Sequence, residues 1–249
     1  GLPLDQADEM DILEANGTVN FGSNKAYRAM LKKIKAGSPA TNPDDLQYIL
    51  DNVDVDNLFE YMALEMFVGN SDIGNIRYYR LHQEGSKWKW IWYDADYGLY
   101  SSKFNSPWSY LKVKGMGEQK IDNTIFLKLL EHPDYKRKFL EKLADVYKTF
   151  TTEYMTQVLD GVVAEIQPEM KNHWERWGEL NDKAVTSEVP TTIDGAYTYW
   201  ESRVNRLYNT LKVRPHRLWD FIKDEFKLTK TEMEELFGPQ PDYPDDAVL

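Results

Sequence analysis

Two short runs of acidic and amide side chains are the residues of this chain best suited to chemistry. They are Asn70-Ser-Asp72-Ile-Gly-Asn75 and Asp94-Ala-Asp96-Tyr-Gly98. Carboxylate and amide oxygens are the hard ligands that magnesium prefers, and a carboxylate can also accept or orient the proton of a hydroxyl acceptor. These residue types therefore suit chemistry on a metal-bound nucleotide.

The order of the two runs along the chain matches that of the functional residues in protein kinases. There a buried helix leads to the catalytic Asp, an Asn follows, a short hairpin comes next, and a second Asp binds the metal. Asp and Asn are also common turn residues, so a turn in the first run and a capped loop in the second would explain the same spacing. Against turns alone, two carboxylates at the end of an apolar strand repel one another unless a cation or hydrogen-bond donors compensate. Spacing alone leaves both interpretations open.

A buried helix and a β-hairpin must position the two runs. Residues 57–67 are apolar apart from Glu60 and Glu65, so we expect a helix that is buried on most sides. Residues 76–81 and 87–92 are typical of two strands joined by a polar turn. This hairpin is the only convincing β unit of the chain.

Three tryptophans alternate along the second strand of the expected hairpin. The alternation predicts that Trp88, Trp90 and Trp92 share one face of the strand. Such a face usually packs against a protein core, and the alternative is a platform that stacks on carbohydrate. We expect the face to pack the hairpin onto the helices.

Helical periodicity predicts most of the remaining chain. The expected helices cover residues 23–37, 122–131, 133–149, 153–177 and 197–211. Pro215 is expected to open a further helix at its first turn, and Thr229 with Glu232 has the capping-box pattern that begins the last one. The expected fold class is α+β, mostly helical, with one embedded hairpin followed by a helical bundle. We expect one domain over residues 1–236 and a Pro- and Asp-rich tail at 237–249.

The overall composition argues against several classes of protein. The chain has 249 residues, a net charge of −11 and a pI near 4.9, which disfavour binding to duplex nucleic acid or to anionic membranes. No run approaches the roughly 18 to 20 apolar residues that cross a bilayer, and the first residues do not resemble a signal peptide. Aromatic residues make up 14% of the chain, which is too much ring surface for a disordered protein.

Other kinds of chemistry find little support in the sequence. The chain has no Cys, and its four His are too far apart for a zinc-binding helix. Gly17 and Gly22 have the spacing of a phosphate loop but lack the Lys that must follow, so we expect a plain turn. Asp51, Asp54 and Asp56 lack the later Gly and Glu of a calcium loop, so we expect them to cap helices.

These segments together resemble the spore coat protein H (CotH) kinase family. The resemblance covers about residues 11–228, with the segments in the family's order. The central segments are Val53-Asp-Val-Asp-Asn-Leu-Phe-Glu-Tyr, Asn70-Ser-Asp72 with Asn75, and Trp92-Tyr-Asp94-Ala-Asp96. The later ones are Leu127-Lys-Leu-Leu-Glu-His-Pro-Asp-Tyr, Glu165-Ile-Gln-Pro-Glu-Met-Lys-Asn-His and Arg214-Pro-His-Arg-Leu.

The resemblance implies the C-terminal lobe of an atypical protein kinase. Such a kinase transfers phosphate from ATP to Ser or Thr of a protein acceptor with Mg²⁺ or Mn²⁺. By resemblance Asp72 is the catalytic Asp, while Asn75 and Asp94 bind both the metal and the nucleotide. Asp96 is the second acid of the metal motif. The acceptor would be a coat or extracellular protein, and the expected location is extracellular or in the spore coat.

Two departures from the family pattern affect these expectations. The loop from Asp72 to Asn75 is about two residues shorter than the family's. The family's β-rich nucleotide-clamping lobe, with its phosphate-contacting Lys, precedes the part that this chain matches, so transfer by this chain alone should be very weak. The alternative is a noncatalytic binding module of the same fold, either secreted, at the cell surface or in the spore coat.

Overall fold

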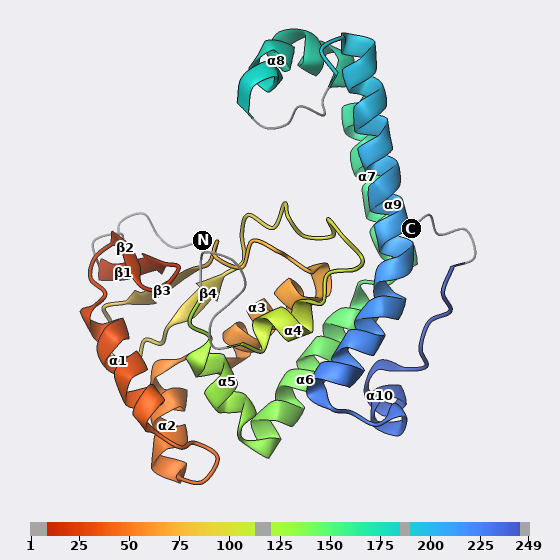
Figure 1. Cartoon of the computed structure of the whole chain (residues 1–249). Coiled ribbons are helices and arrows are strands. Elements are labelled where there is room, and N and C mark those ends of the chain that lie inside the picture. Colours follow the sequence, from red (N-terminus) through yellow and green to blue (C-terminus); the bar gives the residue numbers. More distant parts are fainter. Residues whose placement is uncertain (1–8, 113–120, 185–189, 245–249) are drawn as a thin grey trace. The chain divides into compact units, whose positions relative to one another are not determined.

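The structure, a computed structural model, describes residues 9–112, 121–184 and 190–244, without the side chains of residues 178–184. Contacts divide the chain into two units, one of residues 1–149 and 218–240 and the other of residues 150–217 and 241–249. The described part is mostly helical with a small antiparallel sheet (Figure 1), which confirms the expected α+β class. Within these ranges no helix has both the length and the apolar character needed to cross a bilayer.

The first unit contains a four-stranded antiparallel sheet. Its strands are β1 (Met10–Glu14), β2 (Thr18–Phe21), β3 (Arg77–Leu81) and β4 (Lys89–Ile91), in the order β2-β1-β3-β4. β3 and β4 confirm the expected hairpin, with Tyr78 opposite Trp90. The expectation that this hairpin is the only β unit is wrong, because β1 pairs with both β2 and β3.

Strands β1 and β2 lack a local pattern that would reveal them. Every residue of β2 is exposed, and this strand occupies the place between Gly17 and Gly22 where a plain turn was expected. β1 pairs with β3 along its whole length, although the two strands are far apart in the chain. Strand formation depends on such neighbours more than on intrinsic preference, so short strands of this kind escape a search for periodicity.

The tryptophans of the hairpin do not share one environment. Trp88 and Trp90 are buried, and their ring centroids lie 5.9 and 5.7 Å from that of Tyr78. Trp92 follows the end of β4 and is 45% exposed, so the expected packing against the core is wrong for this residue. The two buried rings pack in the core as expected, and their burial rules out a carbohydrate platform at that face.

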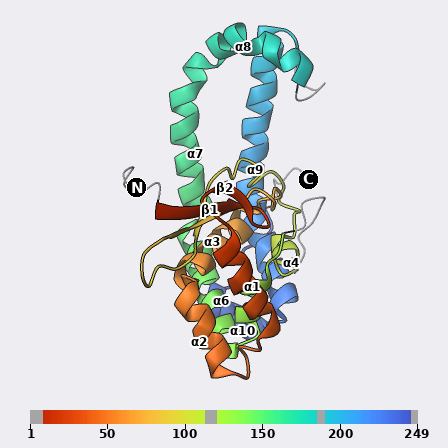
Figure 2. The ribbon, with the colours of Figure 1, turned by 90° about the vertical axis from the view of Figure 1, so that its left-hand side faces the viewer.

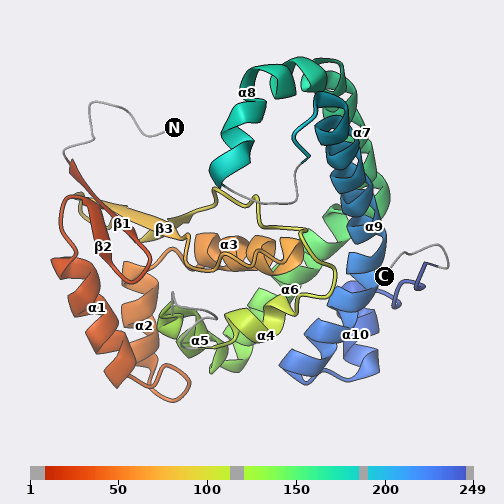
Figure 3. The same ribbon diagram turned by 45° about the horizontal axis from the view of Figure 1, so that its top comes forward.

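Helix α3 (Val55–Val68) is central to the first unit and confirms the buried helix expected over residues 57–67. Asp54 caps it, as expected, by accepting a hydrogen bond from the Asn57 N–H at 3.1 Å. The helix packs against β4, α4 (Ser106–Tyr110) and α6 (Pro133–Thr149). Figure 3 shows α3 between the sheet and these helices. Its C-terminus leads directly to the first run of polar residues.

The first unit also contains α1 (Lys25–Ala36), α2 (Pro43–Asn52), α5 (Thr124–Leu130) and α10 (Lys230–Phe237). Helices α1 and α5 lie within the expected ranges, and α6 has the expected bounds. The capping box of α10 is confirmed, since Thr229 and Glu232 satisfy one another's backbone N–H groups. Helix α2 was not expected, although Asn42 at its N-cap and Pro43 in its first turn are ordinary start signals.

The second unit is helical (Figure 2). It contains α7 (Thr152–Ile166), a 3₁₀ turn (Gln167–Glu169), α8 (Met170–Ala184) and the residues of α9 (Ile193–Phe226) up to position 217. The single long helix expected over residues 153–177 is wrong, because the 3₁₀ turn contains Pro168 and divides it. Proline has no N–H to donate to the preceding turn, so it favours such an interruption.

Pro215, unlike Pro168, does not interrupt its helix. The helices expected before and after Pro215 form the continuous helix α9. A proline removes the hydrogen bond that its N–H would give to the carbonyl four residues earlier, here that of Leu211. Thr152 Oγ1 of α7 donates to the Leu211 carbonyl at 3.2 Å. A hydroxyl from a second helix therefore supplies a donor at the position where the proline removed one.

Candidate functional site

The loop that contains the first polar run begins where α3 ends. Gly69 ends the helix in the left-handed conformation, with a φ of 64°. The N–H groups of Gly69 and Asn70 donate to the Glu65 carbonyl at 3.0 and 3.2 Å. Asn70 Oδ1 accepts from the Asp72 N–H at 3.0 Å, and the Asp72 carbonyl accepts from the Asn75 N–H at 3.1 Å. Asp72 and Asn75 therefore do form a turn.

The side chain of Asn75 joins the two polar runs. Its Nδ2 donates a hydrogen bond to Asp94 Oδ2, although 19 positions separate the two residues in the sequence. The Tyr93 hydroxyl donates to Asn75 Oδ1, so both ends of the amide are held. A turn at Asp72 and a contact between Asn75 and Asp94 are thus compatible, so the turn does not argue against the functional interpretation.

The loop after Asp94 is tied to the C-terminus of α3. Asp94 itself has a φ of 51°, a left-handed conformation that Asp tolerates better than most residues. The Leu99 N–H donates to the Val68 carbonyl at 2.6 Å, and the Gly98 N–H donates to the Ala95 carbonyl at 2.8 Å. A Cβ on Gly98 would lie 2.8 Å from the Ala95 oxygen, so a larger residue there would displace the turn.

The site is negatively charged. Asp94 and Asp96 are exposed and Asp72 is half-buried, and in the described ranges no Lys or Arg forms an ion pair with any of them. Such uncompensated carboxylates favour the binding of a cation. These charges give the cluster a polarity suited to a divalent metal.

The acidic residues of the cluster affect the pKa of the Tyr93 hydroxyl. Burial raises the pKa of its hydroxyl, and the charges of Asp94 and Asp72 raise it further. Arg77, whose guanidinium lies 4.7 Å from the Tyr93 ring centroid, acts in the opposite direction. The charges of Asp72 and Asp94 thus act on the same hydroxyl in the same direction.

Asp96 is the one predicted site residue that the structure does not bring into the contact between Asn75 and Asp94. No hydrogen bond of the described residues joins it to either of them. In the same part of the chain, no three or more His, Cys, Asp or Glu side chains form a group that could hold a metal ion. The oxygen ligands brought together are therefore one carboxylate and one amide.

The pair formed by Asn75 and Asp94 fits magnesium, which takes oxygen ligands and keeps several waters of its own. Asn75 now turns Nδ2 toward Asp94, so a shared cation requires the amide to rotate and present Oδ1 instead. Tyr93 permits this rotation, because its hydroxyl can accept from Nδ2 as readily as it donates to Oδ1. The donor set and the absence of a paired cation at these carboxylates both suit the metal.

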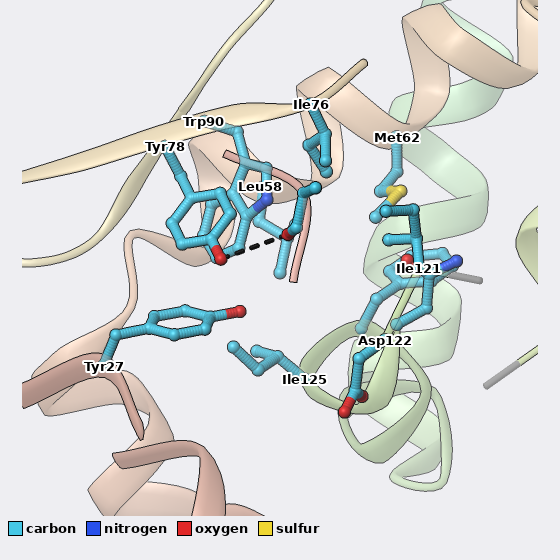
Figure 4. A pocket seen from close by; sticks show the side chains of 12 residues that line it. Tyr27, Leu58, Met62, Ile76, Tyr78, Trp90, Ile121, Asp122 and Ile125 are labelled. Carbon is cyan, nitrogen blue, oxygen red and sulfur yellow. Dashed lines mark hydrogen bonds between the residues drawn. The ribbon is translucent and has the colours of Figure 1, made fainter. Parts of the chain in front are cut away.

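Two hollows lie in the described part of the first unit. A small, partly open one of about 20 Å³, the size for one water, is lined by Tyr27, Tyr78, Trp90 and Asp122, among others (Figure 4). An open pocket of about 310 Å³ lies between Gly69 and Ser71 on one side and residues 100–104 on the other. The first is too small for a nucleotide or peptide, whereas the second adjoins the loop that bears Asp72.

The roles of several residues of this site were not identified from the sequence. Asn70 belongs to the first polar run but had no expected role, and it holds the Asp72 N–H, while Tyr93 binds Asn75 without any pattern that would have indicated it. Glu65 is fully buried in α3, and burial raises the pKa of its carboxyl group. A signal for Glu65 did exist, since it is one of two acids in the apolar run of residues 57–67 and, unlike the exposed Glu60, it lies among mostly buried neighbours.

Comparisons with known proteins identify the family of this chain. The model of the family described as "CotH kinase protein" matches residues 5–218, a range that includes both polar runs and most of the helices. Neither the curated proteins nor the solved structures contain a significant match to the chain. The matched range covers well over half of the sequence, and the chain belongs to the CotH kinase protein family.

Proposed function

We propose that this chain contributes the metal-binding and acceptor side of a protein kinase that transfers phosphate from ATP to Ser or Thr. The observation that supports the proposal most strongly is the contact of Asn75 with Asp94 beside a turn that bears Asp72. Membership in a kinase family implies ATP as the phosphate donor. The nature of the acceptor and the identity of the metal are part of the proposal.

Each polar residue has a separate role in this proposal. The Asp72 carboxylate accepts or orients the proton of the attacking hydroxyl. Asn75 and Asp94 bind Mg²⁺ or Mn²⁺, which would neutralise charge on the phosphates of ATP when bound. Asp96 is proposed as a further metal-side acid that joins when the cation is present. Tyr93 holds the Asn75 amide and so orients it.

The open pocket beside Ser71 supports a macromolecular acceptor. It borders the residue next to Asp72 and is open to solvent, so a polypeptide could approach the carboxylate from that side. From the family alone, we infer that the acceptor is a coat or extracellular protein. We infer in the same way that this protein acts outside the cell or in the spore coat.

Phosphotransfer from labelled ATP tests the proposal. The assay compares this chain and the full gene product that contains it, each with Mg²⁺ or Mn²⁺ and with protein acceptors. We expect transfer that requires the metal and is lost in Asp72→Asn and Asp94→Asn, while Asp51→Asn, a change at an exposed residue of α2, retains it. If the full product transfers no phosphate under any of these conditions, the proposal fails.

A noncatalytic binding module remains the second candidate, and one observation favours it. The loop after Asp94 exposes Tyr97 and Tyr100, which are 52% and 57% exposed and whose ring centroids lie 6.2 Å apart. Exposed aromatic rings of this kind often bind partners. Calorimetric titration separates the candidates, because a kinase should bind Mg²⁺ more tightly with ATP present, whereas a binding module should ignore ATP.

A further inference from the structure

Glu65 of α3 is a fully buried acid without an opposite charge. In the described ranges no Lys or Arg forms an ion pair with it. Its carboxyl is surrounded by neutral polar groups, namely Tyr61 of the same helix, Tyr110 of α4, Asn70 and Trp92, whose hydrogen bonds lower the pKa of the carboxyl, whereas burial, the larger effect, raises it. An ionised carboxylate without a counter-charge is costly in such surroundings, so burial favours the protonated form.

The geometry at Tyr110 points to the same protonation state. Its hydroxyl oxygen lies 2.9 Å from Glu65 Oε2 and 3.2 Å from the Asn70 carbonyl oxygen. A hydroxyl has a single hydrogen to donate, so it cannot fully satisfy two acceptors at once. If Glu65 carries a proton, it can donate to Tyr110, and Tyr110 can donate to Asn70. Both short contacts are then ordinary hydrogen bonds.

Asn70 connects these buried groups to the site. Its side-chain Oδ1 accepts from the Asp72 N–H at 3.0 Å, and its own N–H donates to the Glu65 carbonyl at 3.2 Å. Tyr110 is also held, because its carbonyl accepts from Asn123 Nδ2 at 3.1 Å. A continuous chain of hydrogen bonds therefore runs from Glu65 through Tyr110 and Asn70 to the backbone of Asp72.

We infer that Glu65 is a positioning residue that acts in its protonated form, donating to Tyr110 so that Tyr110 holds the Asn70 turn that orients Asp72. The inference rests on the proposed function for its effect on phosphotransfer. The titratable groups that face this network are Tyr61 and Tyr110, with Asp72 acting on Tyr110 through its charge. Burial raises the pKa of both tyrosines, so they remain neutral donors at physiological pH.

Two substitutions of Glu65, by Gln and by Ala, test whether this residue acts as a neutral hydrogen-bond donor or as a charged group. The Gln amide can donate to Tyr110 as a protonated carboxyl does, so Glu65→Gln in the full gene product should keep kcat within about twofold. Glu65→Ala and Tyr110→Phe should each lower kcat about tenfold with little change in KM for ATP, because misplacement of a reacting group affects the chemical step. Equal losses in Glu65→Gln and Glu65→Ala would overturn the neutral role.

Tyr61→Phe is the matched control. It removes a hydroxyl that faces the same carboxyl group, but among the described residues Tyr61 has no hydrogen bond to Asn70. We expect kcat to stay within about twofold in this variant. A loss as large as that of Tyr110→Phe would show that any disturbance of the buried acid has this effect, which contradicts the specific path through Asn70.

Two measurements on the 249-residue chain test the network without any activity. Infrared difference spectra of the wild type against Glu65→Gln should contain a protonated-carboxyl band at neutral pH. Hydrogen exchange of residues 70–75 should accelerate in Tyr110→Phe and Glu65→Ala and stay unchanged in Glu65→Gln, with α6 unaffected in all three. The absence of the band, or unchanged exchange in Tyr110→Phe, would overturn the inference. Absent phosphotransfer by the full product would overturn the proposed function alone.

Discussion

The side chains of Asn75 and Asp94 form a hydrogen bond that links the turn after α3 to the loop after β4. Asn75 precedes β3 and Asp94 follows β4, so the antiparallel pairing of these strands, with Arg77 opposite Ile91, places both residues at the same open end of the hairpin. Asn75 also accepts from Tyr93, which fixes the plane of the amide. The hairpin therefore acts as the scaffold that turns two separate polar runs into one site.

Asp94→Asn should weaken metal binding without lowering the stability of the metal-free protein. The variant can keep the hydrogen bond from Asn75, but it loses the charge that attracts the cation. We expect Mn²⁺ binding in the presence of ATP to weaken at least tenfold, by calorimetry. The melting temperature without metal should be unchanged or slightly higher, because a like charge is removed from the acidic cluster. A large fall in melting temperature would contradict this account.

Asp72→Asn should affect the chemical step without affecting the binding of ATP. Loss of a group that accepts the acceptor proton costs about a hundredfold or more in kcat. The turn should persist, because it uses the backbone N–H and carbonyl of Asp72 instead of its carboxylate. Steady-state kinetics with varied ATP checks this, and a variant with normal kcat and raised KM for ATP would contradict the assignment.

Gly98→Ala should disturb the site through the backbone. A new Cβ would lie 2.8 Å from the Ala95 carbonyl oxygen and 3.0 Å from Val68 Cγ2, so the turn must shift. We expect weaker metal binding than in the wild type, by isothermal titration, with the helices retained in far-ultraviolet circular dichroism. Gly85→Ala is the control, because a Cβ there meets nothing within 4 Å, although its φ of 72° adds some local strain.

Local sequence signals were sufficient for the elements on either side of the site. The apolar run that became α3, the hairpin and the capping box at Thr229 all have patterns that depend on neighbours a few residues away. Strands β1 and β2 could not be found in this way, because β1 depends on pairing with β3 and β2 exposes every side chain. The expected helix start at Pro215 was wrong for the same reason, because the donor to the Leu211 carbonyl comes from Thr152 of another helix.

The candidate site was predictable as a set of residue types and only partly as a set of contacts. Spacing along the chain indicated Asp72, Asn75 and Asp94, and the hairpin explains why the last two meet. The contact of Tyr93 with Asn75 arises from tertiary packing and has no pattern in the sequence, whereas the contact of Asn70 with the Asp72 N–H is a local turn of the kind that Asn favours. The catalytic and metal-binding roles stay predictions.

The contribution of Glu65 to the stability of the wild type should decrease as the pH rises. Burial raises the pKa of this carboxyl above its usual 4.5, so the folded state holds the proton more tightly than the unfolded state. Stability from this group is therefore full below about pH 4.5 and is lost as the pH rises toward the folded-state pKa. Relative to Glu65→Gln, the free energy of unfolding should fall by at most about 1.4 kcal/mol per pH unit in that window.

Urea unfolding of the two proteins at a series of pH values between about 4.5 and neutral measures this difference. Glu65→Gln is a suitable reference because it has the same size and does not titrate. Tyr61 and Tyr110 do not contribute, since burial raises the pKa of both well above that range. A difference that is constant with pH would mean that the carboxyl group titrates alike in both states.

Thr152 and Pro215 should depend on one another for stability. Thr152→Val removes the donor to the Leu211 carbonyl and should destabilise the second unit by about 1 kcal/mol. Pro215→Ala restores a backbone N–H at the position that normally bonds this carbonyl, so Thr152→Val should cost much less in that background. Hydrogen exchange of α7 and α9 in the four proteins of this double-mutant cycle gives the coupling energy, with Thr152→Ser as the control that keeps the hydroxyl. Equal costs of Thr152→Val in both backgrounds would contradict the compensation.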